Sequence, residues 1–163
     1  MLIRKATISD VEEAGKIYDL AREYMKAAGN PYQWNDVYPS ARDVEEDIKD
    51  GSSYVCDDGG EIVAVFHFHI GSDATYEKIY EGGWEGTEPY GVIHRIAVKH
   101  HGRGIADFCF SECFKLFPNL RIDTHKDNIP MQKSLMKNGF VKKGTVYIKN
   151  GEERIAFQKI KQQ

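Results

Sequence analysis

The stretch that decides the fold runs from Val92 to Ala106 and reads VIHRIAVKHHGRGIA. Its first half is a nearly continuous apolar run, which is typical of a strand buried on both faces, although a histidine and an arginine interrupt it. Two glycines follow, and residues 105–117 then carry apolar residues at helical spacing. The first four N–H groups of a helix are unpaired and lie at the positive end of its dipole. The turn therefore favours a phosphate or pyrophosphate as its ligand. The alternative is a tight strand-to-helix turn in which glycine serves only the backbone geometry.

Extended and helical patterns alternate along the rest of the chain. Strands are expected at residues 2–6, 53–56, 61–70, 92–98, 120–124, 140–148 and 154–159, and helices at 11–25, 41–49, 105–117 and 128–138. Asp10 is expected to cap the first helix in a capping box with Glu13, and Ser40 to cap the second. Asn150-Gly151 predicts a tight hairpin between the last two strands.

Strict alternation predicts which side chains share a face in the two central strands. In strand 61–70 one face should carry Val63, Val65, His67 and His69, and the other Ile62, Ala64, Phe66 and Phe68. In strand 92–98, His94 and Ile96 are two residues apart and are expected on one face. The histidines of both strands would then face a common cleft.

Length and composition bound the class of protein. A chain of 163 residues with 41% hydrophobic and 12% aromatic residues can bury a real core, and residues 1–163 contain no linker or repeat, so one domain is expected. Three cysteines cannot all pair, and no signal-peptide or membrane-spanning run is evident, so we expect a cytoplasmic protein without a membrane partner. A net charge of −3 without a basic cluster argues against nucleic acid as a partner.

Two segments resemble motifs of the GNAT superfamily of acyl-CoA-dependent N-acetyltransferases. Motif A of that superfamily reads Gln/Arg-x-x-Gly-x-Gly/Ala after a hydrophobic strand, and residues 101–106 match it at Gly104 and Ala106, with His101 at the first position. Motif B reads Asn-x-x-Ala-x-x-Leu-Tyr-x-x-x-Gly-Phe, and residues 128–140 match its Asn, Gly and Phe. Leu135 stands at the tyrosine position, where many members carry the acid that protonates the thiolate of CoA.

The expected order of elements, β-α-α-β-β-β-α-β-α-β-β, is similar to that of the superfamily over essentially the whole chain. The resemblance implies an α/β (α+β) fold with a mixed, mostly antiparallel sheet of about seven strands, helices on both faces, and a central parallel strand pair splayed for acyl-CoA. It implies transfer of an acetyl group from acetyl-CoA to an amine by direct attack. The alternative is a non-catalytic or regulatory acyl-CoA-binding module. The positions that would bind the cofactor are Ile96, Ala97, Val98, His101, Gly102, Arg103, Gly104, Ile105, Ala106 and Asn128.

Attack on a thioester requires a deprotonated amine and hydrogen-bond donors for the carbonyl oxygen. His94 is the leading candidate for the base, because imidazole titrates near neutral pH and some members of the superfamily carry a histidine at this place. The alternative is that His94 is a hydrogen-bonded residue of the core. Asp123 and His125, on the neighbouring strand, could orient His94 or replace it, although Asp123 could equally form a structural ion pair. Tyr147 or Ser134 could supply the acid that Leu135 cannot.

The acceptor is expected to be a small-molecule or peptide amine, and the protein could form a homodimer. Residues 71–89 form an insertion that is both aromatic and acidic, with Tyr76, Tyr80 and Trp84 at helical spacing, which suits either a cationic amine or a solvated acidic helix. Candidate acceptor-binding residues are Trp34, Tyr32, His67 and Glu85. His67-x-His69 is also a possible zinc geometry, but no further ligand spacing supports it, and no metal is expected.

Overall fold

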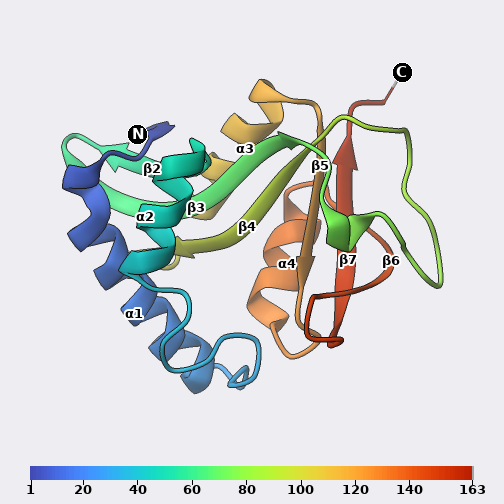
Figure 1. The fold of residues 1–163 in the computed structure, drawn as a ribbon, viewed down its shortest axis with the longest axis horizontal. Helices are drawn as coiled ribbons and strands as arrows, with labels where there is room; N and C mark the ends of the chain where they lie inside the picture. The colour runs from blue at the N-terminus through green and yellow to red at the C-terminus, as the bar shows by residue number, and fades with distance from the viewer. Residues whose placement is uncertain (163) are drawn as a thin grey trace.

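The computed structural model describes residues 1–162, which form a seven-stranded sheet with helices on both faces (Figure 1). The strand order is β1-β2-β3-β4-β5-β7-β6. Its strands are β1 (Leu2–Lys5), β2 (Ser53–Asp58), β3 (Glu61–Gly71), β4 (Tyr90–Val98), β5 (Asn119–Thr124), β6 (Val141–Tyr147) and β7 (Glu153–Ile160). Within the described residues, β4 and β5 are the one parallel pair of neighbours. The mixed, mostly antiparallel sheet expected from the sequence is confirmed.

Four α-helices cover the sheet, namely α1 (Val11–Ala27), α2 (Ala41–Asp50), α3 (Ile105–Leu116) and α4 (Ile129–Lys137). Buried residues of α1 and α2 pack in one core cluster with β2, β3 and β4. Buried residues of α3 and α4 pack in a second cluster on the other face, and this is the larger one. Burial of these two apolar faces positions every element around the centre of the sheet. Within residues 1–162, none of the helices combines the length and apolar character that crossing a bilayer requires.

The starts of the first two helices show how local sequence sets their boundaries. Ser40 caps α2 as expected, since its hydroxyl accepts a hydrogen bond from the Arg42 N–H. The expected capping box at Asp10 is wrong. The Asp10 carboxylate instead accepts a hydrogen bond of 2.8 Å from the Thr7 N–H and pairs with Arg4 at 2.8 Å, so it closes the preceding 3-10 turn, η1 (Ile8–Asp10).

A bulge in β3 changes the expected faces of that strand. Cys56 pairs with Ala64 and Asp57 pairs with Ile62, which leaves Val63 without a partner. As a result Val63 and Ala64 both lie in the core cluster beneath α3, whereas Ile62 joins the cluster beneath α1. The expected grouping of Val63 with Val65 is therefore wrong.

A second bulge lies in β4, at the centre of the molecule. His67 pairs with His94 but Val65 pairs with Ala97, so β4 contains one extra residue between these pairs. Arg95 has φ +55°, a backbone conformation that costs a non-glycine residue about 1–3 kcal/mol. Ile93 and Ile96 consequently lie in the same core cluster, three residues apart. The expectation that His94 and Ile96 share one face is wrong, because the bulge reverses the alternation between them.

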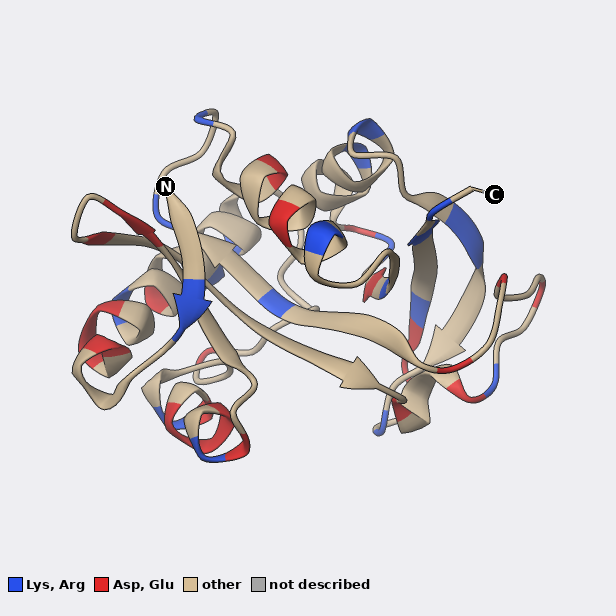
Figure 2. Ribbon diagram, turned by 90° about the horizontal axis from the view of Figure 1, so that it is seen from above, with Lys and Arg blue, Asp and Glu red and all other residues tan. Residues whose placement is uncertain are grey.

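Residues 72–89, here called the strap, connect β3 to β4 by way of the half of the sheet that β5, β7 and β6 form (Figure 1). The helical spacing of its aromatic residues does not produce a helix, and a single 3-10 turn, η2 (Ala74–Tyr76), is the one helical element described there. The charges on the strap are mostly acidic (Figure 2). Their side chains lie on an irregular segment whose course is set by its contacts with the sheet.

Backbone and aromatic contacts fasten the strap to β5, β6 and β7. Tyr80 and Thr145 exchange two backbone hydrogen bonds of 2.8 Å, and Gln158 binds both the N–H and the C=O of Glu85 at 2.8 Å. The Arg121 guanidinium lies 4.6 Å from the ring centroid of Trp84 and 3.9 Å from that of Tyr90. The strap is thus part of the fold and fixes the position of η2 beside β4 and β5.

Candidate active site

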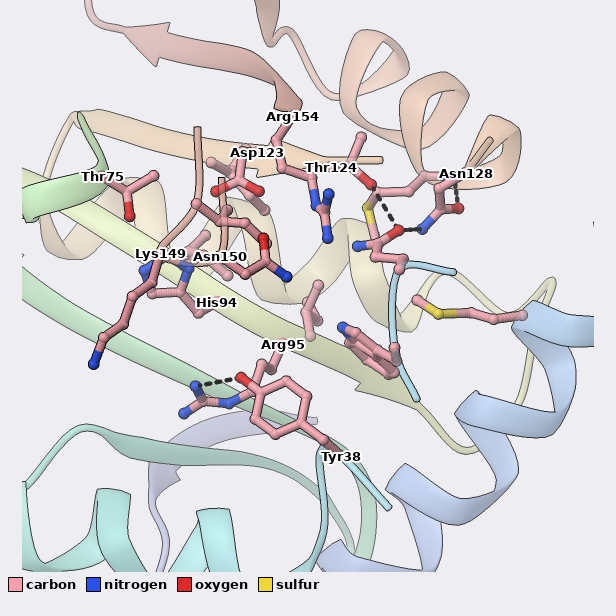
Figure 3. Close-up of a pocket in the computed structure, with 18 residues that line it drawn as sticks. Tyr38, Thr75, His94, Arg95, Asp123, Thr124, Asn128, Lys149, Asn150 and Arg154 are labelled. Carbon is pink, nitrogen blue, oxygen red and sulfur yellow. Dashed lines mark hydrogen bonds between the residues drawn. The ribbon is translucent and has the colours of Figure 1, made fainter. Parts of the chain in front are cut away.

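The central parallel strands separate soon after they begin. β4 and β5 pair only at Gly91 with Leu120 and at Val92 with Arg121, and beyond these two pairs a cavity of about 420 Å³ opens between the strands (Figure 3). A second cavity of about 130 Å³ adjoins it toward the start of α3. Both cavities are lined by Met25, Trp34, Ile96, Asn128 and Met131. The expected splay of the two strands is confirmed, and the two cavities together occupy it.

The edge of β4 that faces the splay has backbone groups without a strand partner. The Lys99 N–H donates a hydrogen bond of 2.8 Å to Val63 of β3. Because N–H directions alternate along a strand, we expect the N–H groups of Ile96 and Val98 to point to the gap. The Tyr18 hydroxyl donates a hydrogen bond of 2.9 Å to the Arg95 carbonyl, which holds the bulge in place. We therefore expect the stretch of β4 after the bulge to offer hydrogen-bond donors to a ligand carbonyl between the strands.

The turn before α3 forms a cradle with exposed backbone. Gly102 and Gly104 have φ +76° and +72°, and a Cβ built on either would meet no heavy atom within 4 Å. No side chain among residues 1–162 caps the N-terminus of α3. Left-handed glycines, open space above them and unpaired helix N–H groups are the features that a pyrophosphate requires. The cradle thus fits the diphosphate of CoA.

His101, which stands at the first position of motif A, lies in contact with α1. Its ring stacks on Tyr24 with centroids 3.7 Å apart, and it lines the smaller cavity. Partial burial lowers the pKa of His101, so its ring is mostly neutral at pH 7. It therefore closes one side of the smaller cavity as an aromatic surface instead of supplying a positive charge.

His94 lines the larger cavity and is oriented by an acid that the sequence did not single out. The His94 Nε2 lies 2.8 Å from Oδ2 of Asp73. Burial raises the pKa of Asp73, but the hydrogen bond and charge of His94 outweigh this effect and leave the pKa of the carboxyl below its ordinary value. Asp73 is therefore ionised and accepts the hydrogen bond from Nε2. It was only one of several acids in the insertion, and no local pattern linked it to a strand 21 residues away.

The other two catalytic candidates lie in different surroundings. Asp123 lines the larger cavity, where its Oδ2 accepts a hydrogen bond of 2.7 Å from Tyr76. Complete burial and the adjacent Asp123 raise the pKa of Tyr76 well above its ordinary value, so this hydroxyl stays protonated as a donor. His125 is absent from the lining of both cavities, and its Nδ1 accepts a hydrogen bond of 3.0 Å from the Asp127 N–H in the turn before α4.

Among the residues expected to bind the acceptor, Trp34 alone lines a cavity. Tyr32 is 75% exposed and lies outside both. Glu85 pairs with Lys143 at 3.2 Å and lies outside both cavities. His67 is half-buried beside Asp47 and forms a hydrogen bond of 2.8 Å with His69. These last three residues therefore do not line either cavity.

Asn128 performs two tasks at the start of α4. Its Oδ1 accepts a hydrogen bond of 3.2 Å from Met131, which caps the helix, and its Nδ2 donates one of 2.9 Å to Gln33. Gln33 also contacts Thr124 at 3.4 Å and so joins the loop after α1 to β5. The residue that the resemblance implies at the cofactor site is therefore also the cap of α4.

Several cavity-lining residues were missed by the sequence analysis. They come from the loop after α1, from the bulge, from β5 and from the β6–β7 hairpin, and they include Gln33, Tyr38, Arg95, Thr124, Lys149, Asn150 and Arg154 (Figure 3). Asn150-Gly151 had marked the hairpin itself, but nothing in the sequence indicated that its tip lies over β4 and β5. The approach of these segments depends on tertiary packing.

The candidates for the general acid differ in position. Leu135 is fully buried in the core cluster beneath α3. Ser134 lines the smaller cavity, whereas Tyr147 lies outside both cavities and packs edge-to-face against Tyr80. Within residues 1–162, no group of three or more histidine, cysteine, aspartate or glutamate side chains is arranged to hold a metal ion.

Comparisons with known proteins place the chain in a family. A GNAT-family acetyltransferase from Streptococcus agalactiae is 31% identical with a TM-score of 0.89, over 99% of this chain and 96% of that one. A GNAT-family acetyltransferase from Listeria monocytogenes (20% identity, TM-score 0.72) is matched over 97% of this chain and 93% of its own. A ribosomal-protein-alanine N-acetyltransferase from Brucella melitensis (20% identity, TM-score 0.63) is matched over 99% of this chain and all of its own. Neither the protein-family models nor the curated proteins give a match. The chain belongs to the GNAT family of acetyltransferases and is an acyltransferase.

Proposed function

We propose that this protein transfers an acetyl group from acetyl-CoA to the amino group of an acceptor by direct attack. The observation that carries the proposal is the gap between β4 and β5, which has the His94–Asp73 pair at one end and the glycine cradle of α3 at the other. Such a gap would hold an acyl-CoA by its diphosphate at the turn and bring its thioester along the open edge of β4 to an amine beside the base.

The chain offers three groups of contacts for acetyl-CoA, which supplies the acetyl group as an activated thioester. The N–H groups from Gly102 to Ala106 would bind the diphosphate at the positive end of α3. The N–H groups of Ile96 and Val98 would donate to carbonyl oxygens along the open edge of β4. Asn128 would border the acyl end, since it lines both cavities.

His94 and Asp73 would handle the proton of the acceptor. A primary amine near neutral pH is mostly ammonium, and the carboxylate of Asp123 would attract it to the cavity. His94 would accept a proton from the nitrogen, and Asp73 would stabilise the resulting imidazolium through the 2.8 Å hydrogen bond. The new C–N bond forms as the C–S bond breaks, the nitrogen releases its remaining excess proton to water, and the released thiolate takes a proton from water, because the buried Leu135 at the tyrosine position has none to give.

The proposal is tested by measuring thiol release and acetylated product with acetyl-CoA and a panel of amines. His94→Gln should bind acetyl-CoA normally by calorimetry and lose about 10² to 10⁴ in kcat/KM, as expected for loss of a general base. Asp73→Asn should lose about 10- to 160-fold, because a hydrogen bond to a charged group contributes about 1.5–3 kcal/mol. The pH–rate limb that reports the base should disappear in His94→Gln.

His100→Gln provides the control, since this histidine lies outside both cavities and contacts Glu61. It should keep full activity. Wild-type kcat/KM in His94→Gln would show that His94 is structural. Tight acetyl-CoA binding without turnover of any amine would favour a non-catalytic acyl-CoA-binding module.

A further inference from the structure

A buried arginine on the wall of the larger cavity has donors without partners. The Arg154 side chain is only 5% exposed, and Figure 3 shows its guanidinium pointing into the cavity beside Asp123 and Thr124. Its Nη1 donates to the Glu152 carboxylate at 3.2 Å and to the Glu153 carbonyl at 3.0 Å. Within residues 1–162, its Nε and Nη2 form no hydrogen bond. One edge of the guanidinium is therefore left to a ligand.

Asp123 and Arg154 are diagonal neighbours across the β5–β7 ladder, yet they do not form an ion pair. Asp123 lies opposite Ala156 in the β5–β7 ladder, and Arg154 is two residues from Ala156 on the same face. Diagonal neighbours of this kind have Cα atoms about 7–8 Å apart, within reach of a long side chain. The ion pairs among the described residues nevertheless include none between Arg154 and Asp123, since the Arg154 pair is with Glu152. The cavity thus presents a positive and a negative group side by side.

The pair of opposite charges specifies a ligand that carries both. Asp123 has Oδ2 hydrogen-bonded to Tyr76, and its other oxygen has no hydrogen-bond donor among residues 1–162. A buried guanidinium with a free N–H edge matches a carboxylate, which it binds with two parallel hydrogen bonds. The Nε and Nη2 groups of Arg154 have no partner among residues 1–162, and a ligand carboxylate would accept hydrogen bonds from both.

We infer that the acceptor is an amino acid or another amine that carries a carboxylate, held with its ammonium group at Asp123 and His94 and its carboxylate at Arg154. This inference rests on the proposed function. It replaces the acidic strap as the source of specificity, because Glu85 pairs with Lys143 outside the cavity. The exposed Lys149, on the hairpin tip that lines the same cavity, adds a second positive charge at its rim.

The test compares acceptors that differ only in the acidic group. Amino acids are paired with their carboxamides, and β-alanine with O-phosphoethanolamine, under saturating acetyl-CoA. Carboxylates should be preferred over carboxamides by at least tenfold in kcat/KM. Arg154→Gln should lose this preference mainly through a higher KM for carboxylate acceptors, so that the ratio of kcat/KM between carboxylate and carboxamide falls toward one, whereas affinity for acetyl-CoA stays unchanged. Arg154→Lys should retain part of the preference, because it keeps the charge but not the planar fork.

Arg42→Gln provides a matched control, since this arginine is exposed on α2 and lies outside both cavities. It should behave as wild type, and melting temperatures should show that each variant is folded. Equal turnover of carboxylates and carboxamides would overturn the inference and leave the proposed function standing. A preference for the phosphate-bearing amine would also overturn it. Absence of turnover with every amine would instead refute the proposed function.

Discussion

The attachment of the strap to β6 can be tested by a single methyl group. A Cβ at Gly82 would lie 1.9 Å from the carbonyl oxygen of Lys143 and 2.9 Å from its carbonyl carbon, and backbone atoms at this distance cannot move aside cheaply. A Cβ at the adjacent Gly83 would meet nothing within 4 Å. Gly82→Ala should therefore push the strap off β6, whereas Gly83→Ala should leave it in place.

The magnitude follows from the hydrogen bonds at the contact. Tyr80 and Thr145 exchange two backbone hydrogen bonds of 2.8 Å, and the Gly83 N–H donates one of 2.9 Å to Lys143. A net contribution of about 0.5–1.5 kcal/mol for each bond gives a loss of about 1.5 to 4.5 kcal/mol. Both substitutions reduce the entropy of the unfolded chain alike, so their difference isolates the contact.

The measurement is urea denaturation of both variants, with the melting temperature as a second readout. At about 2–4 °C per kcal/mol for a chain of this size, Gly82→Ala should melt at least about 3 °C below Gly83→Ala. Because the strap carries Asp73 and Tyr76, kcat/KM should fall as well. If the two variants have equal stability and equal activity, the strap is not held at Gly82 and the reasoning is refuted.

Three further predictions concern the cradle, the core and the pH dependence. Gly104→Val should weaken acetyl-CoA binding by well over tenfold in calorimetry, whereas Gly59→Val, at a similar φ of +63° and also in open space, should share only the backbone strain. Leu135→Tyr should cost about 1–3 kcal/mol in urea denaturation without raising kcat, because the hydroxyl enters a fully buried site; faster turnover would contradict this. Burial lowers the pKa of His67 in the folded protein below the value of about 6.5 that the unfolded chain has. The unfolded chain therefore binds a proton at a higher pH than the folded protein does, and the free energy of unfolding declines as the pH falls below about 6.5. His67→Gln should flatten this decline between about pH 7 and pH 5, and an unchanged slope would exclude His67 as its source.

Local sequence determined the elements and their order. Ser40 caps α2 through its own side chain, Asn150-Gly151 forms the last hairpin, and the glycine turn at residues 102–104 leads into α3 as expected. Each of these features depends on residues within about four positions of one another, so a repeat of hydrophobicity or a single cap residue carries the information. The family motifs, which are also local, indicated the cradle for the same reason.

Tertiary structure decided which side chains face the site. The bulges at Val63 and Arg95 reverse the alternation of β3 and β4, and a period-two pattern contains no signal for one extra residue.

Asp73, which accepts the hydrogen bond of His94, lies on the strap, and Arg154, which lines the larger cavity, lies on β7. Both depend on contacts between segments that are far apart in the sequence, where burial, register and loop attachment act together. The sequence by itself therefore determined the scaffold and the glycine cradle before α3, and only the packing of the sheet with its strap decided which side chains line the larger cavity.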